Sequence, residues 1–326
     1  MAEVTWALDS TTMYATLLAP SRPGRAPGVV LVAGSGPTDR DWNSPLLPGS
    51  NGSARLIAQS LQTLGFASLR YDKRASGPHV RENMRVLMGK LDMQSHVDEL
   101  AGAVRTLASQ EFVRTDRIFA LANSEGTLHA LNYQLHAPAI PLAGLVLIGP
   151  PGRSVGVVAR AQLAEQARAL PDREALLALY DRAIDRFLAG QPMAPDPALP
   201  EGVQTLLQAL ETPANQPFAR ELWTVNASSL LAQVDVPVLV VIGKKDVQVD
   251  WQADGEPLQR AAAGRTDVTF LFPDDANHVL KHESRPRAEL AAAEVVASYN
   301  ASDAYLDGAS MASIQNWLLE HLRDQS

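Results

Sequence analysis

Short apolar runs rich in β-branched residues recur along the chain, and turn residues close each of them. Because the runs are nearly continuous rather than alternating, they suit strands that are buried on both faces of a sheet. Segments with helical spacing, such as 53–64 and 97–107, lie between the runs. This alternation predicts an α/β fold with a mostly parallel central sheet flanked by helices. The runs are 28–33, 66–71, 118–122, 145–149, 236–243 and 268–272.

The opening and the middle of the chain depart from this alternation. Residues 4–20 alternate apolar with polar side chains around a central turn, which predicts an antiparallel hairpin at the sheet edge. From residue 154 to residue 233 the strand pattern stops, and amphipathic helical spacing replaces it. We therefore expect a core domain formed by 1–153 and 234–326, with an inserted helical cap at 154–233.

Composition excludes several classes of protein. With 46% apolar and 20% charged residues, the chain has the make-up of a globular protein rather than a disordered or fibrous one. A net charge of −8 argues against nucleic-acid binding, which needs clustered lysine and arginine. The absence of cysteine excludes disulfides, thiolate catalysis and cysteine-bound zinc. No run resembles a signal peptide or a membrane span, so we expect a cytoplasmic protein without a membrane partner.

The stretch FALANSEGTLHA at 119–130 joins an apolar run to a helical pattern through one polar turn. A strand, a serine between small residues and a helix form the layout of a nucleophile elbow, with Ser124 at its tip. The turn is tight, so the positions two before and two after the serine must be small, and they are Ala122 and Gly126. The motif departs from GxSxG at Ala122, and an ordinary strand-to-helix loop is the alternative interpretation.

A serine hydroxyl is a weak nucleophile at neutral pH, so it needs a base and an acid that orients the base. In hydrolases of this layout the order along the chain is serine, acid, histidine. Asp246 and His278 each follow one of the last two apolar runs, so both are expected at the carboxyl edge of the sheet. Asp250 is the main rival for the role of the acid.

Acyl transfer also requires two backbone N–H groups that bind the developing oxyanion. One should come from the residue after the nucleophile, which is Glu125. The other should come from the loop GSGPTDRD after the first apolar run. Gly34 allows tight backbone geometry there, and the Ser35 amide is the candidate donor.

The other histidines indicate no second chemistry. His282 lies four residues after His278, a spacing that suits a metal pair on a helix, but no HExxH-like general base accompanies them. The glycine-rich motif of a phosphate loop is absent from the sequence as well. We therefore expect neither a metal nor another cofactor.

Five segments together resemble the bacterial carboxylesterases of the α/β-hydrolase superfamily: GSGPTDRD, LRYDKRASG, ANSEGT, GKKDVQV and NHVLK. The resemblance spans most of the chain, including the helical cap, and its motifs are jointly specific. It implies an α/β-hydrolase fold in which Ser124 is the nucleophile, Asp246 orients the base, and His278 is first base and then acid. It also implies an oxyanion hole made by the amides of Ser35 and Glu125.

The chain departs from the family pattern outside this triad, and the departures bear on substrate preference. They are Ala122, Asn123, Thr127, Trp42 after DRD, and Ala75 and Ser76 after DKR. The loop from Ser76 to Gly89 could also border the pocket. The candidates for pocket residues are Gly34, Arg40, Trp42, Arg74 and Asn123.

Two charge clusters, Asp39–Arg40 and Asp72–Lys73–Arg74, follow strands toward the same edge. Buried charges are tolerated when they are paired, so one interpretation is a network that fixes the oxyanion loop, with Glu125 as a supporting member. The other is that Arg40 or Arg74 holds an anionic group of the substrate, because a guanidinium matches a carboxylate. The residues leave both interpretations open.

These features favour a serine carboxylic-ester hydrolase that acts through an acyl-enzyme intermediate on a small to medium ester. The apolar cap would close over the acyl group, with Leu179, Phe187, Phe218 and Trp223 among its candidate residues. A serine peptidase or an acyltransferase would use the same triad, and a non-catalytic hydrolase-like binding protein is a third hypothesis. The expected assembly is a monomer or a homodimer.

Overall fold

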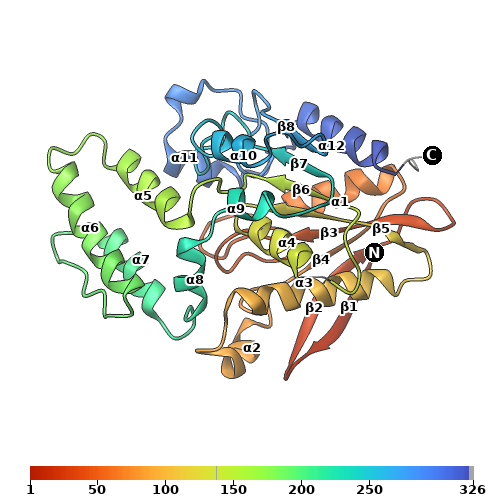
Figure 1. The fold of residues 1–326 in the computed structure, drawn as a ribbon, viewed down its shortest axis with the longest axis horizontal. Helices are drawn as coiled ribbons and strands as arrows, with labels where there is room; N and C mark the ends of the chain where they lie inside the picture. Colours follow the sequence, from red (N-terminus) through yellow and green to blue (C-terminus); the bar gives the residue numbers. More distant parts are fainter. Residues whose placement is uncertain (137, 323–326) are drawn as a thin grey trace.

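A central sheet organises the computed structural model, which describes residues 1–136 and 138–322 (Figure 1). Within those residues the sheet has eight strands in the order β1-β2-β4-β3-β5-β6-β7-β8. β1 pairs antiparallel with β2, β2 pairs antiparallel with β4, and the remaining neighbours are parallel. The strands are β1 (Ala2–Leu8), β2 (Thr11–Leu18), β3 (Ala26–Val32), β4 (Ala67–Tyr71), β5 (Val113–Asn123), β6 (Gly144–Ile148), β7 (Val238–Val241) and β8 (Val268–Leu271).

Helices follow most of the strands, and they cover both faces of the sheet. None of them, in the part of the chain described, has the length and hydropathy that crossing a membrane requires. They are α1 (Ser53–Thr63), α2 (Val80–Leu87), α3 (Met93–Ala108), α4 (Glu125–Leu135), α5 (Val155–Gln166), α6 (Arg173–Leu188), α7 (Glu201–Glu211), α8 (Phe218–Thr224), α9 (Ala227–Leu231), α10 (Gly255–Ala261), the 3₁₀ helix η1 (Arg287–Glu289), α11 (Ala292–Ser298) and α12 (Gly308–Glu320).

Successive strand residues enter different halves of the core. Val30 and Val32 of β3 belong to the apolar cluster that includes residues of α3, α4 and α10, whereas Val29 and Leu31 belong to the cluster under α1 and α12. Strand side chains alternate between faces, so a strand that is covered on both faces must be apolar throughout. This confirms the predicted parallel sheet and explains why its strands read as continuous apolar runs.

The first hairpin follows the sequence pattern, and β5 is longer than that pattern predicts. β1 and β2 form the expected edge hairpin, and Asp9 in its turn has a positive φ of 51°. β5 begins five residues before the apolar run at 118–122, because Val113 pairs with Ala26 across an irregular register. The strand therefore contains a polar stretch that composition alone would assign to a loop.

The helices between β6 and β7 form a separate apolar cluster. α5, α6 and α7 lie at one end of the molecule, away from the sheet (Figure 1). Phe187, Leu177 and Tyr180 are buried among these helices, together with Trp223 of α8. α9 falls inside the expected cap range of 154–233 but packs against α4 and α10 of the core. α8 contributes to both clusters, since Leu222 belongs to the cluster of the core and Trp223 to the separate one.

Candidate active site

Ser124 occupies the turn between β5 and α4 in a strained backbone conformation. Its φ of 53° and ψ of −123° lie where side-chain-bearing residues are rarely found. A Cβ at Gly126 would lie 2.5 Å from the Ala33 carbonyl oxygen, so the turn requires glycine at that position. Every residue from Ile118 to Leu131 is buried except Ser124, which is partly exposed. The turn thus presents one hydroxyl at the carboxyl edge of the sheet.

His278 and Asp246 form a buried pair at the same edge. The Nδ1 atom of His278 lies 2.7 Å from Oδ2 of Asp246. The other carboxylate oxygen of Asp246 accepts the backbone N–H groups of Gln248 and Val249, at 2.7 and 2.9 Å. These three contacts hold the carboxylate in one orientation toward the imidazole.

Asp250, the rival acid, serves a local structural role. Its carboxylate accepts the backbone N–H groups of Gln252 and Ala253, and its own N–H donates to Asp254. No hydrogen bond to His278 is made by Asp250 in the described residues. The geometry therefore brings Asp246, rather than Asp250, to the imidazole.

The serine turn and the imidazole both lie against the end of β6. The Ser124 N–H donates to the Ile148 carbonyl at 2.8 Å, and a Cβ on the next residue, Gly149, would lie 2.9 Å from the His278 ring. The side-chain amide of Asn123 donates to the His278 carbonyl at 2.9 Å. Within the described chain no hydrogen bond joins the Ser124 hydroxyl to His278.

The loop after β3, which is the candidate oxyanion loop, lies against the serine turn. A Cβ on Gly34 would lie 3.2 Å from the Ser124 Cβ, so a side chain there would crowd the nucleophile. Among described residues, no hydrogen-bond partner occupies the amides of Ser35 and Glu125. The Lys73 ammonium donates to the Gly34 carbonyl at 2.6 Å. In a trans peptide the C=O and the next N–H point in opposite directions, so Lys73 also sets the direction of the Ser35 amide.

Lys73 belongs to a buried charge cluster under this loop. Its ammonium lies 3.4 Å from Glu125 Oε1, which is also 3.2 Å from the Nε2 atom of His129. Burial alone would raise the pKa of Glu125, but the Lys73 charge and the His129 hydrogen bond outweigh it and hold that pKa well below its usual range. Burial lowers the pKa of His129 to about 4, so its imidazole is neutral at neutral pH.

A second buried cluster adjoins the first through the neighbouring rings of His96 and His129. Glu99 accepts from the Arg74 guanidinium at 3.0 Å and contacts the Nδ1 atom of His96 at 2.9 Å. Burial would raise the pKa of Glu99, but His96 and Arg74 outweigh it and lower that pKa to about 2. The ring centroids of His96 and His129 are 4.6 Å apart. Phe218 of α8 also contacts both rings, so these charges lie under the inserted helices.

The two arginines among the pocket candidates have their donors engaged within the protein. Arg40 binds Asp72 through two nitrogens, at 3.0 and 2.7 Å, and reaches Thr16 and Glu3 with the third. Arg74 is 2% exposed and donates to Asp9, Ser95 and Glu99. These contacts match the charge network that the sequence suggested. They do not match a site for an anionic group of the substrate.

Two of the pocket candidates are enclosed by the protein. Trp42 is 3% exposed and packs in the apolar cluster under α1 and α12, and Arg74 is enclosed by its carboxylate partners. Gly34 and Asn123 lie beside Ser124, as expected of residues near a reaction centre. Ser76 lines a cavity of about 380 Å³ together with Pro37, next to the oxyanion loop.

Sequence reasoning offered the cluster of Lys73 as one possible support of the candidate oxyanion loop, but it predicted neither the exact contact nor the other residues that hold the candidate catalytic groups in place. The anchoring of the Gly34 carbonyl by Lys73 and the contact between Asn123 and His278 join segments far apart in the chain. Their only sequence signal is a set of polar residues at strand ends, which also suits ordinary turns. Gly149 lies against the imidazole and showed no distinguishing signal beyond its place after a strand.

Comparisons with known proteins find similar chains and similar structures. EstD, an esterase of Thermotoga maritima, is 27% identical over 263 residues, which are 80% of this chain and 56% of that protein. This chain therefore spans little more than half the length of that relative. The solved structure of Est1E from Butyrivibrio proteoclasticus matches with a TM-score of 0.54 at 14% identity, over 99% of both chains. A proline iminopeptidase of Mycobacterium smegmatis matches with a TM-score of 0.55 at 15% identity, over 98% of both chains.

The two structural matches establish the fold alone, because proteins with different activities share it. A family model also matches the sequence itself. Residues 29–293 match the model described as the alpha/beta hydrolase family, which is most of the chain and includes the serine turn, the acid and the histidine. The chain is a member of the alpha/beta hydrolase family.

Proposed function

We propose that this protein is a serine carboxylic-ester hydrolase that acts through an acyl-enzyme intermediate. The observation that carries the proposal is the 2.7 Å contact between Asp246 and His278 at the sheet edge that also presents the strained Ser124 turn. A base held by a buried carboxylate beside an accessible serine is the arrangement that acyl transfer requires. The relationship to an esterase supports an ester as the substrate.

In the first half of the proposed reaction, the Ser124 hydroxyl oxygen attacks the ester carbonyl carbon, and the Nε2 atom of His278 takes the hydroxyl proton. Asp246 holds the Nδ1–H of His278, so Nε2 is the free acceptor and the imidazolium that forms is stabilised. Rotation of the Ser124 side chain about χ1 would bring its oxygen to Nε2, since such contacts commonly tighten only when substrate binds. His278 then protonates the departing alcohol oxygen as the C–O bond breaks.

In the second half, His278 removes a proton from water, and the resulting oxygen nucleophile attacks the acyl carbon. The bond to the Ser124 oxygen breaks, the serine recovers its proton from His278, and the carboxylic acid leaves. The amides of Ser35 and Glu125 donate to the carbonyl oxygen while it carries negative charge in both halves. Lys73 supports this step from the opposite side of the peptide by fixing the Gly34 carbonyl.

The substrate we propose is an ester without an anionic group near its carbonyl. Arg40 and Arg74 bind carboxylates of the protein, so neither guanidinium is open to a substrate anion. The helices α5 to α8 would act as a cap over the site, because Phe218 of α8 packs directly on the buried histidines below the oxyanion loop.

Labelling with a fluorophosphonate tests the nucleophile directly. The intact protein should gain the mass of one adduct, with the modified peptide containing Ser124, and Ser124→Ala should remain unlabelled. The wild type should hydrolyse p-nitrophenyl acetate, and Ser124→Ala should lose that activity while its circular dichroism and melting temperature stay close to those of the wild type.

Two outcomes would contradict the proposal. An unlabelled wild type that hydrolyses no ester would favour a binding protein on the same fold. Faster turnover of aminoacyl anilides than of p-nitrophenyl esters would keep the nucleophile and make the protein a peptidase.

A further inference from the structure

Asn123 lies where three segments of the proposed site meet. It is the last residue of β5, directly before Ser124, and it is buried. Its side-chain amide donates to the His278 carbonyl at 2.9 Å and lies 3.4 Å from the Ile148 carbonyl. A Cβ on Gly34 would lie 3.1 Å from the Oδ1 atom of Asn123. The carboxamide therefore fills the corner between the serine turn, the backbone of the histidine and the candidate oxyanion loop.

The histidine loop, residues 276–282, keeps its shape through its own contacts. The Asn277 N–H donates to the Lys281 carbonyl at 2.9 Å. The Asn277 side chain accepts the N–H groups of Val279 and Lys281, at 3.1 and 3.0 Å. Leu280 has a positive φ of 60°, which is typical of a tight turn. The shape of the loop is therefore fixed internally, whereas its position relative to the serine depends on contacts with other segments.

One hydrogen bond joins the histidine loop to the serine turn. In the part of the chain that the structure describes, the bond from Asn123 to the His278 carbonyl is the only hydrogen bond between residues 119–127 and that loop. Asp246 contacts the Nδ1 atom of His278 at 2.7 Å. His278 is thus held at two points, its carbonyl oxygen and one ring nitrogen. Its other ring nitrogen, Nε2, remains for the proposed exchange of protons with the serine.

We propose that Asn123 is a positioning residue that sets the distance between the Ser124 hydroxyl and the imidazole of His278. This role rests on the proposed esterase function and adds a residue to its machinery. Asp246 orients the ring, whereas Asn123 fixes the backbone from which the ring extends. A general base must lie within hydrogen-bond reach of the proton it removes, so a shift of that backbone slows the reaction. A carboxamide suits this role because it remains a donor at every pH at which the imidazole titrates.

The first test measures kcat and KM for p-nitrophenyl acetate in Asn123→Leu, which retains a branched side chain and removes the hydrogen-bond donor. The value of kcat should fall roughly 10- to 100-fold, because the base is displaced from the serine. KM should change less than about threefold, because the contact is made to the protein and not to the substrate. Asn132→Leu makes the same change at a partly exposed asparagine of α4 and should leave both constants unchanged.

Melting temperatures verify that Asn123→Leu folds, and if it does not, Asn123→Ala provides the same comparison with a smaller side chain. A folded variant with the kcat of the wild type would overturn the inference. A raised KM with an unchanged kcat would make Asn123 a contact of the substrate, and it would overturn the inference as well.

A double-mutant cycle tests whether Asn123 acts through the imidazole. It compares kcat/KM for p-nitrophenyl acetate in the wild type, Asn123→Leu, His278→Ala and the double variant, since loss of one member of a triad leaves measurable residual catalysis. Asn123→Leu should lower kcat/KM roughly 10- to 100-fold in the wild type but less than about twofold in His278→Ala, where no base remains to be positioned. Equal losses in the two backgrounds would show that Asn123 acts independently of His278 and would overturn the inference.

Failure of the proposed reaction would look different from failure of this positioning role. A wild type that takes up no fluorophosphonate at Ser124 and hydrolyses no ester would overturn the reaction and the role together. A labelled and active wild type, with the same kcat as its Asn123→Leu variant, would overturn the role alone.

Discussion

Lys73 illustrates how a single residue can support a reaction without touching the substrate. It is 4% exposed, and its ammonium is used on the Gly34 carbonyl and on Glu125. A buried ammonium is tolerated only where it is paired and hydrogen-bonded. Because the Gly34 carbonyl and the Ser35 amide belong to one planar peptide, the charge pair below the loop controls the direction of a proposed oxyanion donor.

Lys73→Met should therefore lower kcat more than it changes KM. Losing an oxyanion donor outright costs roughly 100- to 1000-fold in kcat, so a loosened donor should cost on the order of 10- to 100-fold. Steady-state kinetics on p-nitrophenyl acetate measure both constants. Lys244→Met removes a partly exposed lysine paired with Asp274 and is the control. A folded Lys73→Met protein with wild-type kcat would contradict the positioning role.

Asp246 and Asp250 offer a second comparison at the scale of residues. Asp246→Asn should lower kcat by about 10⁴-fold, because an amide stabilises the wrong imidazole tautomer. Asp250→Asn should change kcat little, since that side chain accepts backbone N–H groups of its own turn. The kcat values of the two variants decide which aspartate is the acid. Melting temperatures verify that both variants fold. A larger loss in Asp250→Asn would move the acid to that residue.

At the scale of elements, α3 and α4 bring two acid–histidine pairs together. His96 and Glu99 are three residues apart on α3, and Glu125 and His129 are four apart on α4. Residues at these spacings share one face of a helix, so each helix presents a carboxylate and an imidazole to the other. The packing of α3 against α4 thus places a charge cluster directly under the elbow.

This cluster predicts a loss of stability in mild acid. The pKa of His129 is about 4 in the folded protein and about 6.5 in an unfolded chain. Between these values the unfolded state binds a proton that the folded state does not, so the free energy of unfolding falls as pH drops from about 6.5 to 4. His129→Gln should reduce that fall. Urea unfolding at successive pH values measures it.

The control for this measurement is His136→Gln, which alters an exposed histidine at the end of the same helix. It should leave the pH dependence as in the wild type. If the free energy of unfolding fell equally between pH 6.5 and 4 in the wild type and in His129→Gln, His129 would be excluded as the cause. Glu99, with a folded pKa of about 2, adds a separate loss at lower pH, from about 4.3 down to 2.

At the scale of the whole molecule, the inserted helices join the core through a few polar contacts. Arg153, just before α5, binds Asp254 through two nitrogens at 3.0 and 2.8 Å. Asp254 is fully buried and also accepts the N–H groups of Arg153 and Asp250. Together with the contact from Gln162 to Gln248, this pair orients α5 relative to the loop that carries Asp246.

Arg153→Leu should lower the free energy of unfolding by about 3–5 kcal/mol, because it leaves the Asp254 carboxylate buried without its counter-charge. Arg160→Leu removes an equally bidentate pair with Asp181 in which both side chains are more than a third exposed, and should cost less than about 1 kcal/mol. Chemical denaturation of both variants provides the comparison. Equal losses of unfolding free energy in Arg153→Leu and Arg160→Leu would show that burial of Asp254 contributes nothing to the pairing energy.

The sequence by itself determined the sheet and the order of the candidate groups. Apolar runs mark buried parallel strands because every side chain of such a strand enters the core. A serine between Ala122 and Gly126 ends one run, and Asp246 and His278 follow later runs. The strand positions therefore also give the order of the candidate groups. Side-chain periodicity and turn chemistry are local properties, so one chain is enough to predict them.

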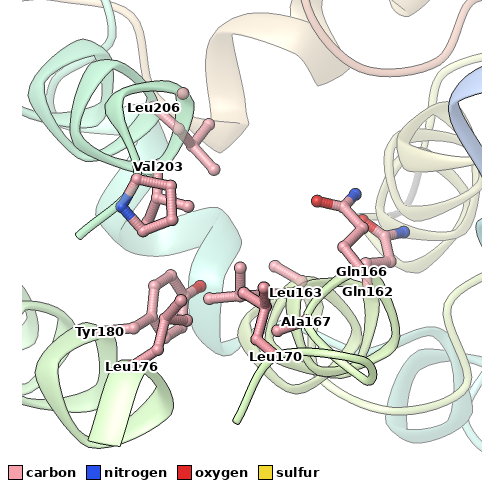
Figure 2. Close-up of a pocket in the computed structure, with 12 residues that line it drawn as sticks. Gln162, Leu163, Gln166, Ala167, Leu170, Leu176, Tyr180, Val203 and Leu206 are labelled. Carbon is pink, nitrogen blue, oxygen red and sulfur yellow. The ribbon is translucent and has the colours of Figure 1, made fainter. Parts of the chain in front are cut away.

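The tertiary structure alone decided which distant side chains meet. Packing of α3 against β4 buried Arg74 with Glu99, and closure of the loop after β3 brought the Gly34 carbonyl to Lys73. A cavity of about 480 Å³ lies between α5, α6 and α7, because these three helices leave a gap that their side chains do not fill (Figure 2). Such contacts depend on the relative positions of whole elements, and helical spacing within each element carries no information about them.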